Sequence, residues 1–169
     1  MPQYLGRVRL GGKALNKLFS YGVADDFLWT FDCDAREWSR VKASFIRVPG
    51  NSHNEPADMH LDHSMQICVA QPINKVYFLG GSKDRHFNEW TDEMREWNLV
   101  SGNIVFKSKM PFKQFDFRVC FSQYFKIYCI GGCASFFDKT SRPQNAVYDI
   151  ITDSWSLLPE LNQQVDEAE

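Results

Sequence analysis

The stretch NKVYFLGG, residues 74–81, is a run of apolar residues that leads directly into two glycines. Val76 and Phe78 would lie on one face of an extended strand. Tyr77 and Leu79 would lie on the other, so both faces are apolar. A strand that is apolar on both faces is expected to be covered on both faces. The stretch therefore predicts a buried β-strand that ends at a pair of glycines.

Two other stretches of the chain resemble this one. FKIYCIGG at 125–132 keeps both glycines, and NKLFSYGV at 16–23 keeps the first but has Val23 in place of the second. Each stretch is followed by an Asp or Asn with a Trp or Ile six residues later. These pairs are Asp32 and Trp38, Asn98 and Ile104, and Asp149 and Trp155. Repeats at such intervals indicate an architecture built from one structural unit.

Each copy is predicted to form four short strands, which makes the chain all-β. Another short β-prone run precedes each glycine stretch, and no segment combines helical periodicity with caps. The repeat region spans 1–159, and the expected limits within it are about 4–45, 63–108 and 115–158 for the copies and 42–62 for an inserted loop. The acidic tail, 160–169, is expected to be disordered.

These features resemble the kelch repeat, in which one strand ends in Gly-Gly and a later Tyr-Asp pair precedes a Trp. The corresponding residues are Gly22, Phe31, Asp32 and Trp38 in the first copy, Gly80, Gly81, Trp97 and Asn98 in the second, and Gly131, Gly132, Tyr148, Asp149 and Trp155 in the third. The resemblance implies three blades of a kelch-type β-propeller. It also implies structural roles for these residues: the glycines would allow a positive φ or a close approach, most of all the first of each pair, and the aromatic rings would pack blade on blade.

Three blades would leave two apolar sheet faces uncovered, because propellers typically close with about four to eight blades. If each face exposes several hundred Å², the lost burial is on the order of 10 kcal/mol. We therefore expect these faces to be covered by further propeller blades, by a second copy of the chain, or by neighbours in an assembly.

The long connections between strands are the expected sites of partner binding. In kelch propellers the connections between the second and third strands of a blade, and those from one blade to the next, emerge on one face that commonly recruits partners. The long connections of these two kinds are the inserted loop between the first two copies and the stretches 82–93 and 133–145. Arginine and aromatic side chains are favoured interface anchors. The residues predicted to bind a protein partner are Arg85, His86, Trp90, Phe136, Phe137, Lys139 and Arg142. The alternative is that these are solvated loops without a binding role.

No catalytic, metal or cofactor site is predicted. Gly80-Gly81 lacks the lysine spacing and the following helix of a phosphate loop. The histidines His53, His60 and His63 match no zinc-binding pattern. Some kelch-related propellers are enzymes, including copper oxidases of the galactose oxidase type, but no residues here stand out as their metal ligands.

Charge and cysteine content limit the possible binding partners and cellular compartments. A net charge of -2 argues against a nucleic-acid binder, and no run of 18 apolar residues predicts a membrane span. Five irregularly spaced cysteines favour reduced thiols in the cytoplasm. A disulfide between Cys120 and Cys129 stays an alternative, because a two-residue turn at 124–125 would place them opposite each other. Gly11-Gly12 is interpreted as a hairpin turn rather than as a counterpart of Gly80-Gly81.

The leading functional hypothesis is a non-enzymatic protein-interaction scaffold within a larger cytoplasmic complex. A cytoskeletal complex is one common setting for kelch proteins. The alternative hypothesis is the substrate-recognition part of a ubiquitin-ligase adaptor. That role usually requires a BTB or F-box segment, which the sequence does not show.

Overall fold

The protein is all-β and is built from three four-stranded antiparallel sheets. The structure, a computed structural model, describes residues 8–14, 17–22, 27–42, 65–82, 89–133 and 144–161. The first sheet contains β1 (Val8–Ala14), β2 (Lys17–Gly22), β3 (Phe27–Asp32) and β4 (Glu37–Lys42). The second contains β5 (Gln66–Ala70), β6 (Lys75–Leu79), β7 (Met94–Asn98) and β8 (Ile104–Phe106). The third contains β9 (Arg118–Ser122), β10 (Lys126–Ile130), β11 (Asn145–Asp149) and β12 (Ser154–Leu158).

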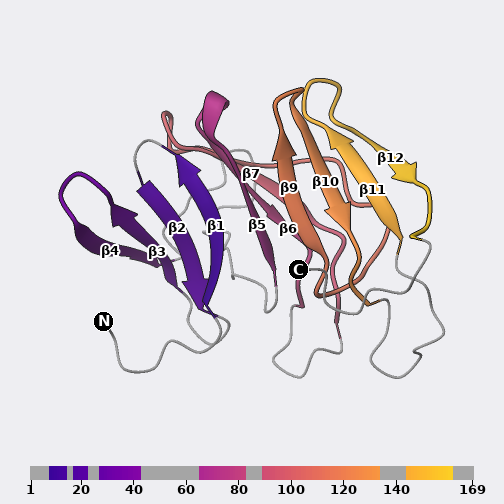
Figure 1. Ribbon diagram of the computed structural model, residues 1–169, viewed down its shortest axis with the longest axis horizontal. Helices are drawn as coiled ribbons and strands as arrows, with labels where there is room; N and C mark the ends of the chain where they lie inside the picture. Colours follow the sequence, from indigo (N-terminus) through magenta and orange to yellow (C-terminus); the bar gives the residue numbers. More distant parts are fainter. Residues whose placement is uncertain are drawn as a thin grey trace, which may run out of the picture.

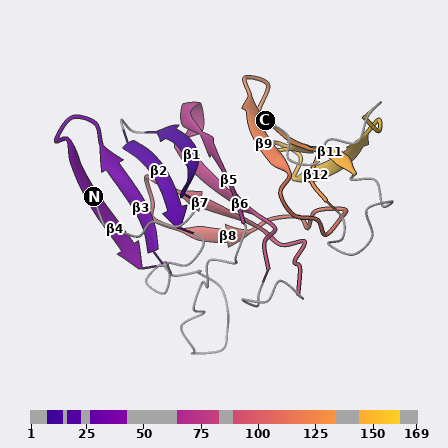
Figure 2. The same ribbon diagram turned by 60° about the horizontal axis from the view of Figure 1, so that its bottom comes forward.

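Each sheet is a meander, because its strands pair in chain order. A 3-10 turn, η2 (Gln71–Ile73), joins β5 to β6. Figure 1 shows the three sheets side by side in the order of the sequence, and the second sheet still lies between the other two in Figure 2. The arrangement is that of blades in an incomplete β-propeller, as the sequence predicts.

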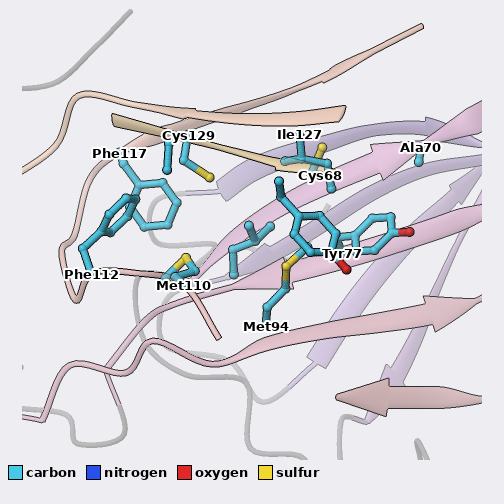
Figure 3. Packing of buried hydrophobic residues seen from close by; sticks show 12 residues of the cluster. Cys68, Ala70, Tyr77, Met94, Met110, Phe112, Phe117, Ile127 and Cys129 are labelled. Carbon is cyan, nitrogen blue, oxygen red and sulfur yellow. The ribbon is translucent and has the colours of Figure 1, made fainter. Parts of the chain in front are cut away.

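The second sheet is covered on both faces, which confirms the prediction made from residues 74–81. Val76 and Phe78 of β6 pack toward the first sheet, where they meet Phe19 of β2. Tyr77 and Leu79 pack toward the third sheet. Figure 3 shows this second core, with side chains of the third sheet directed toward those of the second.

The third sheet is covered on one face only. Ile127 and Cys129 of β10 are buried against the second sheet. Tyr128 and Ile130, which alternate with them, are only partly buried and lie on the opposite face. Both faces of this strand are apolar in the sequence, so its expected cover on the second face is not supplied by the described residues.

The same turn closes the third and fourth strands of every sheet. A side-chain oxygen of Asp32, Asn98 or Asp149 accepts hydrogen bonds from the backbone amides two and three residues further along the chain. Such bonds stabilise a turn locally. The residue four positions after each has a positive φ: 57° at Arg36, 74° at Gly102 and 51° at Asp153. The repeated Asp or Asn therefore caps this turn, which explains its fixed position.

The predicted hairpin turn at Gly11-Gly12 is wrong. Both glycines lie within β1, where the register shifts between Leu10 and Gly12. Ala14 pairs with Lys17, so the chain reverses after these glycines. A shift of this kind is a β-bulge, which inserts an extra residue and is well served by glycine.

The predicted two-residue turn between β9 and β10 is also wrong. Ser122 pairs with Lys126, which leaves a turn of three residues, 123–125. Cys120 consequently faces Tyr128 and not Cys129. A shift of one residue moves a side chain to the other face of the sheet. The two thiols therefore lie on opposite faces of the third sheet, and all five cysteines are free.

Several sequence-based expectations fall on residues that the structure does not describe. Residues 43–64 contain most of the predicted inserted loop together with His53, His60 and His63, and residues 162–169 contain most of the predicted tail. Within the described ranges, no helix has the length and apolar character needed to cross a membrane.

Candidate partner-binding surfaces

The aromatic pair of the third copy ties the third sheet to the second. Tyr148 of β11 and Trp155 of β12 are cross-strand partners, with ring centroids 5.1 Å apart. The Trp155 indole nitrogen donates a hydrogen bond of 2.9 Å to the carbonyl of Ser108, which follows β8. The Tyr148 hydroxyl donates to the carboxylate of Asp153. These contacts make the pair part of a junction between two sheets.

Asp153 is the acidic group of this junction. It accepts a hydrogen bond from the Ser108 amide, and the Lys107 ammonium lies 3.2 Å from its carboxylate. Partial burial disfavours the charged form of the acid. The hydrogen bonds from Tyr148 and Ser108, together with Lys107, outweigh this effect and lower the pKa of Asp153 to about 2. The turn of the third sheet is thus held to the second by an ionised carboxylate.

The aromatic pair of the first copy has the same local geometry but lies on an open face. Phe31 and Trp38 are cross-strand partners with ring centroids 5.1 Å apart. They lie on the face opposite Phe19, which packs on the second sheet. Trp38 is 45% exposed. The pair therefore belongs to a surface that faces away from the rest of the described structure.

The two junctions between sheets are built alike. The aromatic residue two positions after the start of the second strand packs edge-on against the aromatic residue near the end of the third strand of the next sheet. Phe19 meets Trp97 with a ring separation of 6.2 Å, and Tyr77 meets Tyr148 with one of 6.3 Å. Each sheet thus has two different faces, here named the B-aromatic face, after Phe19, Tyr77 and Tyr128, and the C-aromatic face, after Phe31, Trp97 and Tyr148.

Among the residues that the structure describes, one face of each type has no sheet packed against it. The first sheet exposes its C-aromatic face, which carries Leu18, Phe31 and Trp38. The third sheet exposes its B-aromatic face, where Cys120 is exposed and Tyr128 partly buried. These two open faces are the surfaces that a further blade or partner would cover.

Of the seven predicted partner-binding residues, only Trp90 lies within the described ranges. It stacks on Phe115 with a ring separation of 4.6 Å. Trp90 forms an isolated antiparallel β-bridge with Ser82, and Phe115 forms one with Cys133. Each aromatic residue therefore lies where a long connection meets its sheet. The stack thus brings the bases of the connections 82–93 and 133–145 together. The remaining residues, which lie outside the described ranges, are Arg85, His86, Phe136, Phe137, Lys139 and Arg142.

A buried glutamine, which sequence reasoning missed, holds the ends of the second of these connections. The Gln114 amide nitrogen donates to the carbonyls of Gly131 and Gln144, at 2.8 and 2.9 Å. The Gln114 carbonyl oxygen accepts from the Gln144 amide. Asn145 adds a bond, because its side-chain oxygen accepts from the Gly131 amide. The two ends of the connection are therefore fixed, and the only hint in the sequence is a polar Gln114 among aromatic residues.

The second glycine of the third copy also belongs to this base. Gly132 has a φ of 93°, and a Cβ placed there would lie 2.4 Å from the carbonyl oxygen of Phe115. At Gly80 the nearest atom to such a Cβ is the flexible methyl group of Met110, at 3.0 Å. Gly131, the first glycine of the same pair, has a positive φ of 70°. Both glycines of the third copy therefore have a structural role, and the close approach of backbone atoms adds a requirement for the second.

Two thiols lie in the core between the second and third sheets. Burial raises the pKa of Cys68 to about 12 and raises the pKa of Cys129 well above its usual value. Both thiols are therefore neutral at physiological pH and pack as small apolar groups.

Comparison with known proteins adds no family to this geometry. The chain matches no protein-family model, and no curated protein matches it.

Proposed function

We propose that this chain is a kelch-repeat protein that acts as a non-enzymatic scaffold for protein–protein interaction in a larger cytoplasmic complex. The observation that carries the proposal is the shared base of the two long connections, where Trp90 stacks on Phe115. The stack anchors both connections at neighbouring points of the described structure, and loops on a rigid scaffold are common sites of recognition. A cytoskeletal complex is the setting that the kelch resemblance favours.

The kelch assignment is supported by the geometry that repeats from sheet to sheet. The capped turn at Asp32, Asn98 and Asp149 recurs in all three. Two sheets also have the aromatic pair across their third and fourth strands at the same ring separation of 5.1 Å. A recurring unit with its own cap and packing residues supports three copies of one blade.

Binding rather than catalysis is supported by the roles of the repeat residues. Asp149 caps a turn, and Tyr148 and Trp155 join two sheets, so these repeat positions have structural roles. Each of the two long connections contains one arginine and two aromatic residues, which are favoured interface anchors. The free cysteines support a reducing compartment such as the cytoplasm.

The test is affinity purification with the intact chain and two variants. Arg85→Ala combined with Phe136→Ala removes one predicted anchor from each long connection. The matched control is Tyr124→Ala, which removes a 69% exposed aromatic side chain from the turn at the opposite end of β10. Mass spectrometry identifies the captured proteins, and thermal unfolding reports on the fold.

We expect the wild-type chain and the Tyr124→Ala control to retain the same protein partner at the same yield. The double variant should lose that partner and unfold at the wild-type temperature, because substitutions in connecting loops usually change stability little. Equal capture by all three proteins would rule out the loop surface as the binding site.

A further inference from the structure

We propose that the open faces of the first and third sheets bind each other in a second copy of this chain, which closes a head-to-tail dimer of six blades. In this dimer the B-aromatic face of the third sheet packs on the C-aromatic face of the partner's first sheet. The twofold axis repeats the contact, so no sheet face stays open. The second copy contacts only the open sheet faces, so this dimer does not depend on the binding role proposed for the two long connections.

The two junctions inside the chain supply the first reason. At both, a B-aromatic face packs on a C-aromatic face, through Phe19 on Trp97 and through Tyr77 on Tyr148. Neither junction joins two faces of the same type. The chain leaves open one face of each type, which is the combination that a second copy can satisfy with an interface it already uses twice.

The residues on the open faces match those of the covered junction. Tyr128 holds in β10 the position that Tyr77 holds in β6, and Phe31 holds in β3 the position of Tyr148 in β11. A head-to-tail contact would place Tyr128 edge-on against the partner's Phe31. Val147 pairs with Tyr128 where Glu96 pairs with Tyr77 in the second sheet, so the cross-strand neighbour of Tyr128 is apolar. A partly exposed apolar pair of this kind favours association over contact with water.

The hydrogen bond of Trp155 has a matching arrangement at the open junction. Trp155 donates to the carbonyl of Ser108, which follows the fourth strand of the preceding sheet. The residue in the same place after β12 is Pro159, and the residue in the place of Trp155 is Trp38. The Pro159 carbonyl accepts one bond from Asn145 and, like any carbonyl oxygen, can accept a second. It is the natural acceptor for the partner's Trp38 indole.

Charge is complementary near the same place, with the signs reversed. Lys107 directly precedes the acceptor Ser108, and Glu160 directly follows the equivalent residue Pro159. At the covered junction Lys107 meets the turn residue Asp153. The corresponding turn residue of the first sheet is Arg36, which is exposed. The segment that would approach it, just after β12, carries the exposed Glu160. An arginine from one copy would therefore face a glutamate from the other, which favours the head-to-tail pairing over pairing of like faces.

Symmetry makes the assembly finite. Each chain supplies three sheets, so two chains supply six, within the range of about four to eight blades that propellers adopt. A head-to-tail contact that closes after two copies gives a stable dimer, whereas one that does not close gives an open fibre.

The first experiment measures mass in solution with the full chain, by light scattering after size exclusion. The wild type is expected at twice the chain mass of 19.6 kDa. Trp38→Asp on one open face and Tyr128→Asp on the other should each raise the dissociation constant at least about tenfold, because they place a charge in an apolar contact. The control is Val100→Asp, a 76% exposed position in a turn of the second sheet, which should leave the mass unchanged.

Mixing the two variants identifies the head-to-tail geometry. A Trp38→Asp chain keeps its third-sheet face and a Tyr128→Asp chain keeps its first-sheet face, so the mixed pair has one intact junction. A tagged copy of one variant should capture the other more strongly than it captures itself. If like faces paired instead, one of the two variants alone would remain fully dimeric.

Charge exchange gives a second test that leaves the apolar faces intact. Arg36→Glu and Glu160→Arg should each weaken the dimer a few-fold, and the double variant should restore wild-type affinity. Circular dichroism and thermal unfolding show that each variant is folded. A wild-type monomer at tens of micromolar, a mass that rises without limit, or a dimer insensitive to both face variants would overturn the proposal. A monomer would also mean that another protein or further blades cover these faces.

Discussion

Tyr148 with Trp155 and Phe31 with Trp38 are the same cross-strand pair in two different surroundings. Their rings are 5.1 Å apart in both sheets, with interplanar angles of 44° and 47°. Yet Tyr148 is fully buried where Phe31 is only partly buried. Likewise, Trp155 is partly buried where Trp38 is 45% exposed. The local pair is therefore set by strand pairing within one blade, and its burial is set by the neighbouring sheet. A motif can thus have its full geometry before the surface that it serves is covered.

The surroundings decide how much each pair contributes to stability. Around Tyr148 and Trp155 the second sheet supplies the edge of Tyr77, the Ser108 carbonyl and the charge of Lys107. The described residues supply no equivalent sheet on the open face of the first blade. The covered pair should therefore stabilise the chain by itself, and the open pair should do so only when something packs on it.

The largest expected difference is between Tyr148→Ala and Phe31→Ala. Truncating the buried Tyr148 leaves a cavity between two sheets and should lower the free energy of unfolding by about 3–5 kcal/mol. Phe31→Ala should cost only about 1 kcal/mol at high dilution, since its ring is partly exposed. Chemical denaturation at low protein concentration measures both.

Protein concentration sharpens this comparison. The cost of Tyr148→Ala should be the same at every concentration, because its neighbours are in the same chain. The cost of Phe31→Ala should grow as concentration rises, if a second copy covers the open face. Equal costs at high dilution would mean that the open pair is already covered within one chain.

An intermediate effect is expected when the indole nitrogen is removed. Trp155→Phe loses the hydrogen bond to Ser108 and should lower stability by about 1–2 kcal/mol. Trp38→Phe should change stability by less than about 0.5 kcal/mol at high dilution, because an exposed indole is solvated. Thermal unfolding of the two variants provides the measurement, and Trp155→His, which restores a ring N–H donor, tests the hydrogen bond itself.

The sequence predicted the features that depend on residues close together along the chain. The apolar alternation of residues 74–81 indicated a strand covered on both faces, and the spacing of Asp149 and Trp155 indicated a repeated hairpin. The errors came from local ambiguity. Gly11-Gly12 is a turn signal, but glycine serves a β-bulge equally well. The register of Cys120 depended on whether a turn has two or three residues, which its side chains did not specify.

The base of the long connections could not be predicted, for a different reason. Gln114 binds backbone groups of Gly131 and Gln144, which are 17 and 30 positions away in the chain. Backbone carbonyls carry no sequence signal, so the partner of a buried amide is visible only in the fold. The burial of Tyr128 could not be predicted for the same reason. Its strand resembles that of Tyr77, but the third sheet packs on Tyr77, and no sheet among the described residues packs on Tyr128.

The smallest expected effect is a difference in the pH dependence of stability between the turn at Asp153 in the third sheet and the turn at Arg36 in the first. The pKa of Asp153 is lowered to about 2, so its charge stabilises the fold above the ordinary pKa of an aspartate, near 4. That contribution should be lost as the pH falls from about 4 to about 2, and solvent screening limits it to about 1 kcal/mol. The turn of the first sheet has Arg36 in this place, so it has no carboxylate at the equivalent position. The free energy of unfolding, measured from pH 6 to pH 2, should therefore depend less on pH in Asp153→Asn than in the wild type. Asp32 and Asp149 contribute equally to the pH dependence of both proteins, since hydrogen bonds from backbone amides lower the pKa of both aspartates. An unchanged pH dependence would show that Asp153 does not hold the second and third sheets together through its charge.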